Sequence, residues 1–361
     1  MSSPSNSHFQ PAGLATLIGS LPVDTYDKAL EWITTYTPQI PLWPQLPSNP
    51  LEGMMNQFVE GLPGIIESGG STIFNLETDT FEAEQLSFWE EYLITAEDPS
   101  STLTSRFAVS NQRANGIYQL KKLLQENSST PSAVKGQITG PFTLLTGITD
   151  HNKRLGYYEP TFREMAVKAL AMKGAWQVEF FKELNLPIII FIDEPALAGL
   201  GSSAFISIDK DDIAQDLSEV VDAIKSSGGL AGIHVCANTD WTFLLSLELD
   251  VLSFDAHGFF DKLITCKKLV HAFLERGGII AWGIVPTANA EVINKESVES
   301  LVALWEHQAE QLVGGKWTMR TILTQTLITP SCGTGAITQD AALKVLELTH
   351  GVSETLRSKY L

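Results

Sequence analysis

Short apolar runs alternate with longer amphipathic stretches along most of the chain. Apolar runs of about four to eight residues that end in polar or turn residues predict strands, and amphipathic stretches predict helices. Residues 187–192 form a continuous apolar run, which is typical of a strand buried on both faces. The pattern predicts strands at residues 14–18, 39–42, 133–138, 187–192, 230–235, 250–254, 279–282 and 325–328. It predicts helices at residues 26–36, 161–184, 211–226, 259–276, 296–313 and 338–350, two of which end at glycine pairs.

This alternation is interrupted once. Residues 44–131 hold two further amphipathic stretches, 82–93 and 111–124, and they predict a helical insertion after the second strand that could act as a lid. Eight strand-then-helix units predict a (β/α)8 TIM barrel, so we expect residues 1–361 to form one barrel domain with this segment inserted at about 44–131. A doubly wound open sheet is the alternative α/β fold, because the second and eighth strands are weakly marked.

Composition and charge narrow the choice of compartment and partners. The hydrophobic content of 44% and the charged content of 18% are typical of a globular protein, and no apolar run approaches the roughly 20 residues that span a bilayer. A net charge of −18 argues against nucleic acid and anionic membranes as partners. Residues 1–7 lack a basic and apolar leader, and three cysteines do not suggest a disulfide framework. We therefore expect a cytoplasmic protein.

Chemically reactive side chains follow the predicted strands at their carboxyl ends. In a parallel barrel these ends meet at one mouth, so residues distant in sequence become neighbours there. The residues in question are Ser20, Thr139, Asp193, Glu194, His234, Cys236, Asp255 and Cys332.

The strongest of these signals is a set of nitrogen and sulfur donors. His234 and Cys236 are two apart at the end of one strand, so they project to the same face. Cys332 would supply a third donor from a distant segment. Histidine and thiolate are zinc ligands, and three firm ligands with a weak or open fourth position are typical of a reactive zinc site. The alternative is a buried polar pair with Cys332 as a core thiol.

Five motifs between Ile18 and Cys332 carry a resemblance to a known family. The motifs are Ile18-Gly19-Ser20-Leu21-Pro22, Thr139-Gly140-Pro141, Ile192-Asp193-Glu194-Pro195-Ala196-Leu197, His234-Val235-Cys236 and Thr329-Pro330-Ser331-Cys332-Gly333. Together they resemble the catalytic barrel of cobalamin-independent methionine synthase, within the superfamily that includes uroporphyrinogen decarboxylase. The decarboxylases hold their substrate with arginines near the N-terminus, whereas the first arginine here is Arg106, so that activity is not expected.

The resemblance implies a zinc-dependent methyltransferase that moves a methyl group to homocysteine and forms methionine. Zinc would be held by His234, Cys236 and Cys332. Asp255 stands where the family has a glutamate ligand, and His257 is a rival for that fourth position. No catalytic residue is implied beyond the zinc-activated thiolate of the substrate.

The resemblance also assigns the amino acid end of the substrate. Ile18, Gly19 and Ser20 would hold the carboxylate of homocysteine. Asp193 would bind its ammonium group through a charge-assisted hydrogen bond. Glu52 is the nearest counterpart of a family glutamate that shares this role.

Two departures from the family concern the methyl donor. The full-length enzymes carry an additional N-terminal barrel that helps bind folate, and this chain matches only the catalytic barrel. The family also has a histidine after the seventh strand that is thought to protonate the folate leaving group, and residues 281–289 contain none. A methyl-corrinoid leaves without acid help, so we expect methylcobalamin or a methylated corrinoid protein as donor.

Two other functions remain open at this level. The acceptor could be another thiol, such as coenzyme M. The chain could also be a non-catalytic zinc- or corrinoid-binding partner of a separate enzyme.

Overall fold

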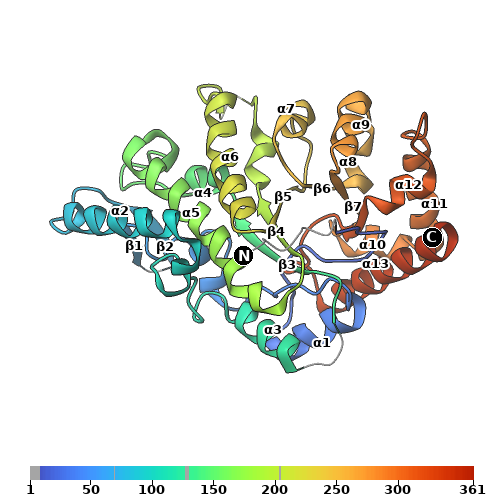
Figure 1. Cartoon of the computed structure of the whole chain (residues 1–361), viewed down its shortest axis with the longest axis horizontal. Coiled ribbons are helices and arrows are strands. Elements are labelled where there is room, and N and C mark those ends of the chain that lie inside the picture. Colours follow the sequence, from blue (N-terminus) through green and yellow to red (C-terminus); the bar gives the residue numbers. More distant parts are fainter. Residues whose placement is uncertain (1–8, 69, 127–129, 203–204) are drawn as a thin grey trace, which may run out of the picture.

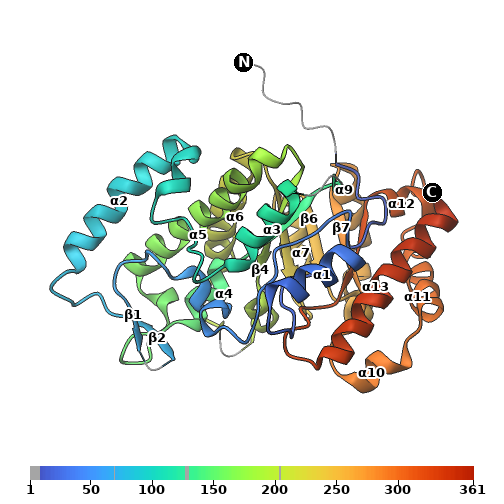
Figure 2. The same cartoon turned by 90° about the horizontal axis from the view of Figure 1, so that it is seen from below.

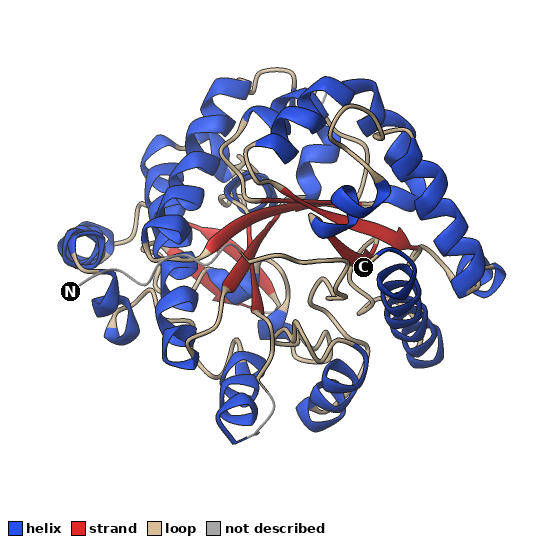
Figure 3. Cartoon of the chain, turned by 45° about the vertical axis from the view of Figure 1, so that its right-hand side comes forward, coloured by secondary structure: helices blue, strands red, loops and turns tan. Residues whose placement is uncertain are grey.

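A curved parallel sheet lies at the centre of the molecule, with helices outside it (Figures 1 and 3). The computed structural model describes residues 9–68, 70–126, 130–202 and 205–361, so the predicted absence of a leader in residues 1–7 lies outside the described part. The described sheet has six strands in the order β3-β4-β5-β6-β7-β8. Its strands are β3 (Val134–Thr139), β4 (Ile188–Asp193), β5 (Leu230–Val235), β6 (Val251–Phe254), β7 (Ile279–Val285) and β8 (Thr326–Pro330).

The register of the first four strands aligns their polar carboxyl ends. Thr139 of β3 pairs with Asp193 of β4, Asp193 pairs with His234 of β5, and His234 pairs with Ser253 of β6. Side chains alternate between the two faces of a strand. Below this row β3 has the polar Gln137 and Lys135, and the other inward positions are mostly apolar. These positions form a separate inner core of Leu14, Ile18, Ile40, Ala133, Ile189, Phe191, Val251, Ile279, Ala281 and Leu327. The sheet thus carries a dry floor beneath a polar rim.

Helices cover the outer face of the sheet. α5 packs against α6, and α13 packs against α11, α1 and β8 (Figure 2). The helices are α1 (Tyr26–Tyr36), α2 (Phe81–Glu97), α3 (Asn115–Glu126), α4 (Pro141–Gly147), α5 (Pro160–Phe181), α6 (Lys210–Ser226), α7 (Trp241–Ser246), α8 (Ala256–Leu263), α9 (Lys267–Glu275), α10 (Ala290–Lys295), α11 (Val298–Glu310), α12 (Met319–Thr324) and α13 (Gln339–Tyr360). Among the described residues, no helix is long and apolar enough to cross a membrane.

The predicted closed (β/α)8 barrel is wrong, because the described residues form a six-stranded sheet. Residues 14–18 and 39–42, predicted as the first and second strands, make only isolated bridges: Ala15 with Ile328, and Leu42 with Lys135. Prolines recur at positions 38, 41, 44 and 47. Proline lacks the N–H group that a strand ladder requires, so this segment cannot extend its pairing. The two segments still lie between β8 and β3, since Thr16 N donates to Ile328 O (3.0 Å) and Lys135 N to Pro41 O (2.9 Å).

The segment between the second predicted strand and β3 contains more than the two expected helices. Besides α2 and α3 it forms an antiparallel hairpin of β1 (Ile65–Ser68) and β2 (Ser71–Phe74). It also has the 3-10 turns η1 (Pro50–Glu52), η2 (Asn56–Phe58) and η3 (Pro99–Thr104). α2 extends away from the sheet in Figure 2.

Several remaining elements differ in detail from the predictions. The single helix expected at residues 259–276 is divided into α8 and α9 by η8 (Ile264–Cys266). Further 3-10 turns are η4 (Gly156–Tyr158), η5 (Lys182–Leu184) and η6 (Pro195–Gly199). The helix at 26–36 and the strand at 230–235 are confirmed with their predicted bounds.

Glu194 ties the ends of β3 and β4 together. Its carboxylate accepts hydrogen bonds from Phe142 N (2.9 Å), Thr143 N (2.8 Å) and Thr143 Oγ1 (2.6 Å) at the start of α4. Gly140 lies directly against this carboxylate: a Cβ atom at residue 140 would come within 2.2 Å of it. Glu194 is therefore fully occupied in positioning the strand ends.

Gly140→Ala should lower the free energy of unfolding by about 1–3 kcal/mol, because the added methyl group overlaps a buried carboxylate that cannot move without losing its hydrogen bonds. Gly53→Ala is the matched control, since its Cβ would meet no atom closer than 3.4 Å. Urea unfolding curves measure both variants. Equal free energies of unfolding in the two variants would contradict the proposed close packing of Gly140 against the Glu194 carboxylate.

Candidate metal centre

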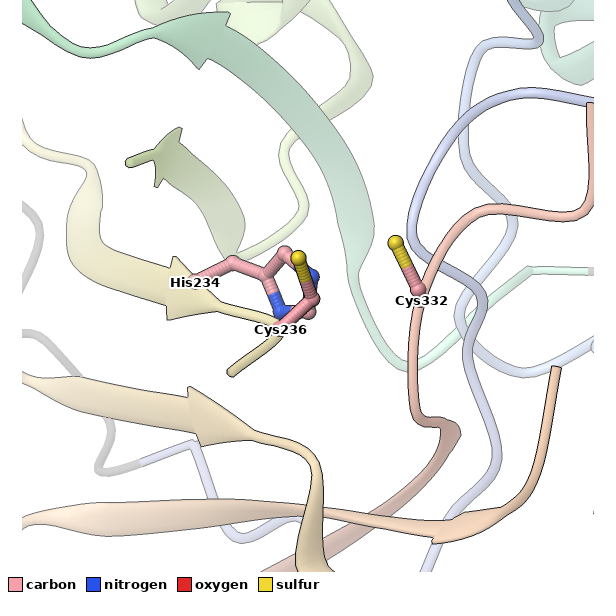
Figure 4. A group of neighbouring side chains, drawn as sticks. All are labelled: His234, Cys236 and Cys332. Carbon is pink, nitrogen blue, oxygen red and sulfur yellow. The ribbon is translucent and has the colours of Figure 1, made fainter. Parts of the chain in front are cut away.

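The structure brings three of the predicted metal ligands into one group. The ligand atoms of His234, Cys236 and Cys332 all lie within 4.8 Å of one another. His234 and Cys236 come from the end of β5, whereas Cys332 comes from the loop after β8 and points its sulfur toward them (Figure 4). Segments almost a hundred residues apart thus supply one nitrogen and two sulfur donors, a set that suits a metal such as zinc.

His234 is oriented by a neighbour on the next strand. Its Nδ1 lies 2.9 Å from Ser253 Oγ on β6. Its Nε2 is buried and has no hydrogen-bond partner in the described part of the chain. Burial lowers the pKa of His234 to about 3, and the Lys135 charge acts in the same direction. The imidazole is therefore neutral, and a serine on one ring nitrogen leaves the other free to bind a metal.

The two cysteines influence each other's ionisation. The Cys332 side chain beside Cys236 lowers the pKa of Cys236 to about 7, although burial opposes this change. The same neighbour and burial raise the pKa of Cys332. One thiolate thus forms readily near neutral pH, which is the state in which cysteine binds a metal.

Neither candidate for the fourth ligand belongs to the group of three. Asp255 caps α8, because its Oδ1 accepts a hydrogen bond from Gly258 N (2.8 Å). The Asp255 carboxylate is still close enough for its charge to raise the pKa of Cys236. His257 Nε2 lies 3.1 Å from Glu296 Oε1.

The Ile18-Gly19-Ser20 turn lies against the loop that carries Cys332. Thr334 N donates to Ser20 O (3.0 Å), and Gly335 N donates to Ser20 Oγ (3.2 Å). A Cβ atom at Gly333 would come within 2.3 Å of Ser20 Oγ, so only glycine fits this approach. The turn predicted for a carboxylate therefore lies beside the Cys332 loop, and among the described residues the Ser20 hydroxyl accepts one hydrogen bond and donates none.

Asp193 occupies the strand position next to His234. Its Oδ1 is buried and has no hydrogen-bond partner among the described residues. Burial raises the pKa of Asp193 to about 7, while the Lys135 charge opposes this shift. Buried polar atoms are usually paired, so an unpaired carboxylate oxygen next to the three candidate donors is a group that a bound ligand could complete.

Glu52, the second residue predicted to hold an amino group, is engaged elsewhere. One carboxylate oxygen accepts a hydrogen bond from Tyr26, and the other accepts one from Leu46 N (2.7 Å). Burial raises the pKa of Glu52. The structure therefore shows Glu52 joining α1 to the segment before η1.

The sequence analysis missed Lys135. This side chain lies on β3, is fully buried, and donates from Nζ to Ile18 O (2.5 Å) and Gln137 Oε1 (3.2 Å). Burial lowers its pKa to about 7, and Asp193 opposes that change. A charged residue within the apolar strand that leads to Thr139-Gly140-Pro141 was the available signal, because lysine is rarely buried without a role.

Comparisons with known proteins show a likeness in fold. No family model matches the chain, and no curated protein matches it significantly. A solved structure from Listeria monocytogenes, provisionally described as a vitamin-B12-independent methionine synthase, is similar with a TM-score of 0.50 and 13% sequence identity. The similarity covers 93% of this chain and 86% of that one. At this identity the likeness shows the fold alone.

Cys332→Ser should abolish retention of one zinc ion per chain, because it removes the one member of the group of three described donors that does not come from the end of β5. The matched control is Cys266→Ser, whose sulfur lies in η8 and is 3.4 Å from Thr242 Oγ1. Metal content after zinc loading and dialysis is measured by atomic emission. Equal zinc content in both variants would show that the three side chains do not form the binding site.

Ser253→Ala should weaken zinc binding by about 10–100-fold, because the variant loses the hydrogen bond that orients His234. Competition with a chromogenic chelator gives the dissociation constant. The exposed Ser246→Ala, whose hydroxyl donates to Phe243 O in α7, is the control. An unchanged dissociation constant in Ser253→Ala would mean that the serine does not support a metal ligand.

Proposed function

We propose that this protein is a zinc-dependent methyltransferase that transfers a methyl group to the thiolate of homocysteine and forms methionine. The observations that carry the proposal are three grouped metal-type donors, a buried carboxylate oxygen without a partner among the described residues, and the Ser20 turn beside the Cys332 loop. A substrate with a thiol, an ammonium group and a carboxylate matches these three features. The likeness in fold to a protein described as a methionine synthase supports the same class.

Zinc is the proposed metal, held by His234, Cys236 and Cys332, with Asp255 as the proposed fourth ligand. Bound zinc would act as a Lewis acid that keeps the substrate thiol deprotonated at neutral pH. Two thiolate donors reduce the positive charge at the metal, which leaves the substrate sulfur more nucleophilic. Asp255 would have to exchange its hydrogen bond to Gly258 N for the metal.

The surrounding residues would orient the amino acid. Asp193 would accept the ammonium group on the oxygen that now lacks a partner. The Gly19-Ser20 turn would receive the carboxylate through the Ser20 hydroxyl and nearby backbone amides. Both groups hold the substrate so that its sulfur meets the metal, which fixes the direction from which the methyl group must approach.

Different observations favour two different methyl donors. Residues 281–289 contain no histidine to protonate a folate leaving group, which favours methylcobalamin or a methylated corrinoid protein. The similar Listeria protein is described as vitamin-B12 independent, which favours methyl-tetrahydrofolate. A site that binds an ammonium group and a carboxylate disfavours coenzyme M as the acceptor, because coenzyme M carries neither group.

Zinc-loaded protein should form methionine from homocysteine and one of the two donors, supplied in parallel assays. Asp193→Asn should raise the KM for homocysteine roughly 10–100-fold, because a hydrogen bond to a charged group contributes about 1.5–3 kcal/mol. The exposed Asp261→Asn is the control.

Methionine formation is measured by mass spectrometry over a range of homocysteine concentrations. Absence of methionine with both donors, despite full zinc occupancy, would reject the activity. An unchanged KM in Asp193→Asn would reject the assigned role of the carboxylate.

A further inference from the structure

Lys135 is a buried lysine to which the proposed reaction assigns no role. Its side chain starts on the inner face of β3, next to the apolar floor, and is completely shielded from solvent. Its ammonium group lies 4.4 Å from the centre of the Phe191 ring. Burying an ammonium group is costly unless neighbouring groups compensate for the lost hydration, so its surroundings indicate its purpose.

Those surroundings belong to the proposed amino acid site. Nζ donates to the carbonyl oxygen of Ile18, the first residue of the Ile18-Gly19-Ser20 turn (2.5 Å). A second bond goes to Gln137 Oε1, and the Gln137 amide in turn donates to Trp43 O (3.0 Å). Lys135 thus holds the backbone of the turn through its hydrogen bond to Ile18 O.

The same ammonium group is close enough to Asp193 for the charge of that carboxylate to act on it. Among the described residues Lys135 forms no ion pair within 4.0 Å, and Asp193 is the acid whose charge acts on it. The Oδ1 atom of Asp193 therefore feels the charge of Lys135 but accepts no hydrogen bond from it. An opposite charge nearby reduces the cost of keeping a carboxylate in this dry position.

We propose that Lys135 is a positioning residue that makes the site selective for thiols carrying an α-amino acid group. It would hold the Ile18 carbonyl so that the turn can receive a carboxylate, and it would hold Asp193 ready for an ammonium group. This inference rests on the proposed function and adds a selectivity determinant to it. A thiol without charged groups would gain nothing from Lys135.

A second buried lysine supplies the comparison. Lys173 lies in α5, is also completely buried, and has no hydrogen-bond partner for its Nζ among the described residues. Its charged neighbours are Glu60 and Arg113, neither of which belongs to the metal group or the turn. Replacing Lys173 therefore removes a buried lysine charge, as replacing Lys135 does, but at a position away from the proposed site.

The test is calorimetric binding of homocysteine and of ethanethiol to zinc-loaded protein. Lys135→Met should weaken homocysteine binding at least tenfold and leave ethanethiol binding and zinc content unchanged. Lys173→Met should change none of the three. Lys135→Gln removes the charge and shortens the side chain but keeps an N–H donor, so it tests loss of the charge in a variant that is still polar.

The outcomes separate this inference from the function on which it rests. If the parent protein binds ethanethiol but not homocysteine, both the proposed substrate and the proposed role of Lys135 are rejected. If the parent protein binds homocysteine and both Lys135 variants bind it equally well, the role of Lys135 alone is rejected. Equal weakening of homocysteine and ethanethiol would also overturn it, because a structural role would affect both thiols alike.

Discussion

The in-register pairing of parallel strands is the constraint on which the site depends. Thr139, Asp193, His234 and Ser253 are successive partners across four strands, so one row of the sheet presents them together. A shift of one residue in any strand would turn its polar end toward the outer helices. Glu194 secures this row from outside, since it links the end of β4 to the start of α4. The position of His234, and of Cys236 two residues later, follows from these contacts.

The polar row is costly to bury, and the structure compensates for it unevenly. Ser253 satisfies one nitrogen of His234, and the backbone carbonyl of Ile18 satisfies Lys135. His234 Nε2 and Asp193 Oδ1 have no partner among the described residues. Unsatisfied groups lower stability, so they are expected where a bound metal or substrate completes them. The two atoms lie on residues that pair across β4 and β5, so the sheet places them close together.

The segments between β8 and β3 show how local chemistry limits a fold. Their residues occupy the space where two more strands would complete a barrel, and backbone hydrogen bonds join them to β8 and β3. Recurring prolines between residues 38 and 47 prevent a continuous ladder of the second segment with β3, where the bridge of Leu42 with Lys135 stays isolated. Just after the first of these segments, Ser20 accepts hydrogen bonds from the loop that carries Cys332.

Periodicity and residue chemistry by themselves determined the local elements and the donor types. The bounds of the helix at 26–36 and of the strand at 230–235 follow from spacing alone, as does the shared face of His234 and Cys236, because side-chain direction in a strand repeats every two residues. Only the tertiary structure decided that Cys332 reaches this pair, that Asp255 caps α8, that Glu52 binds Tyr26 and that Lys135 lies beneath the Ile18 turn. It also decided that the sheet has six strands in the described residues. Such contacts join segments far apart in the chain, and their geometry depends on packing that no local pattern contains.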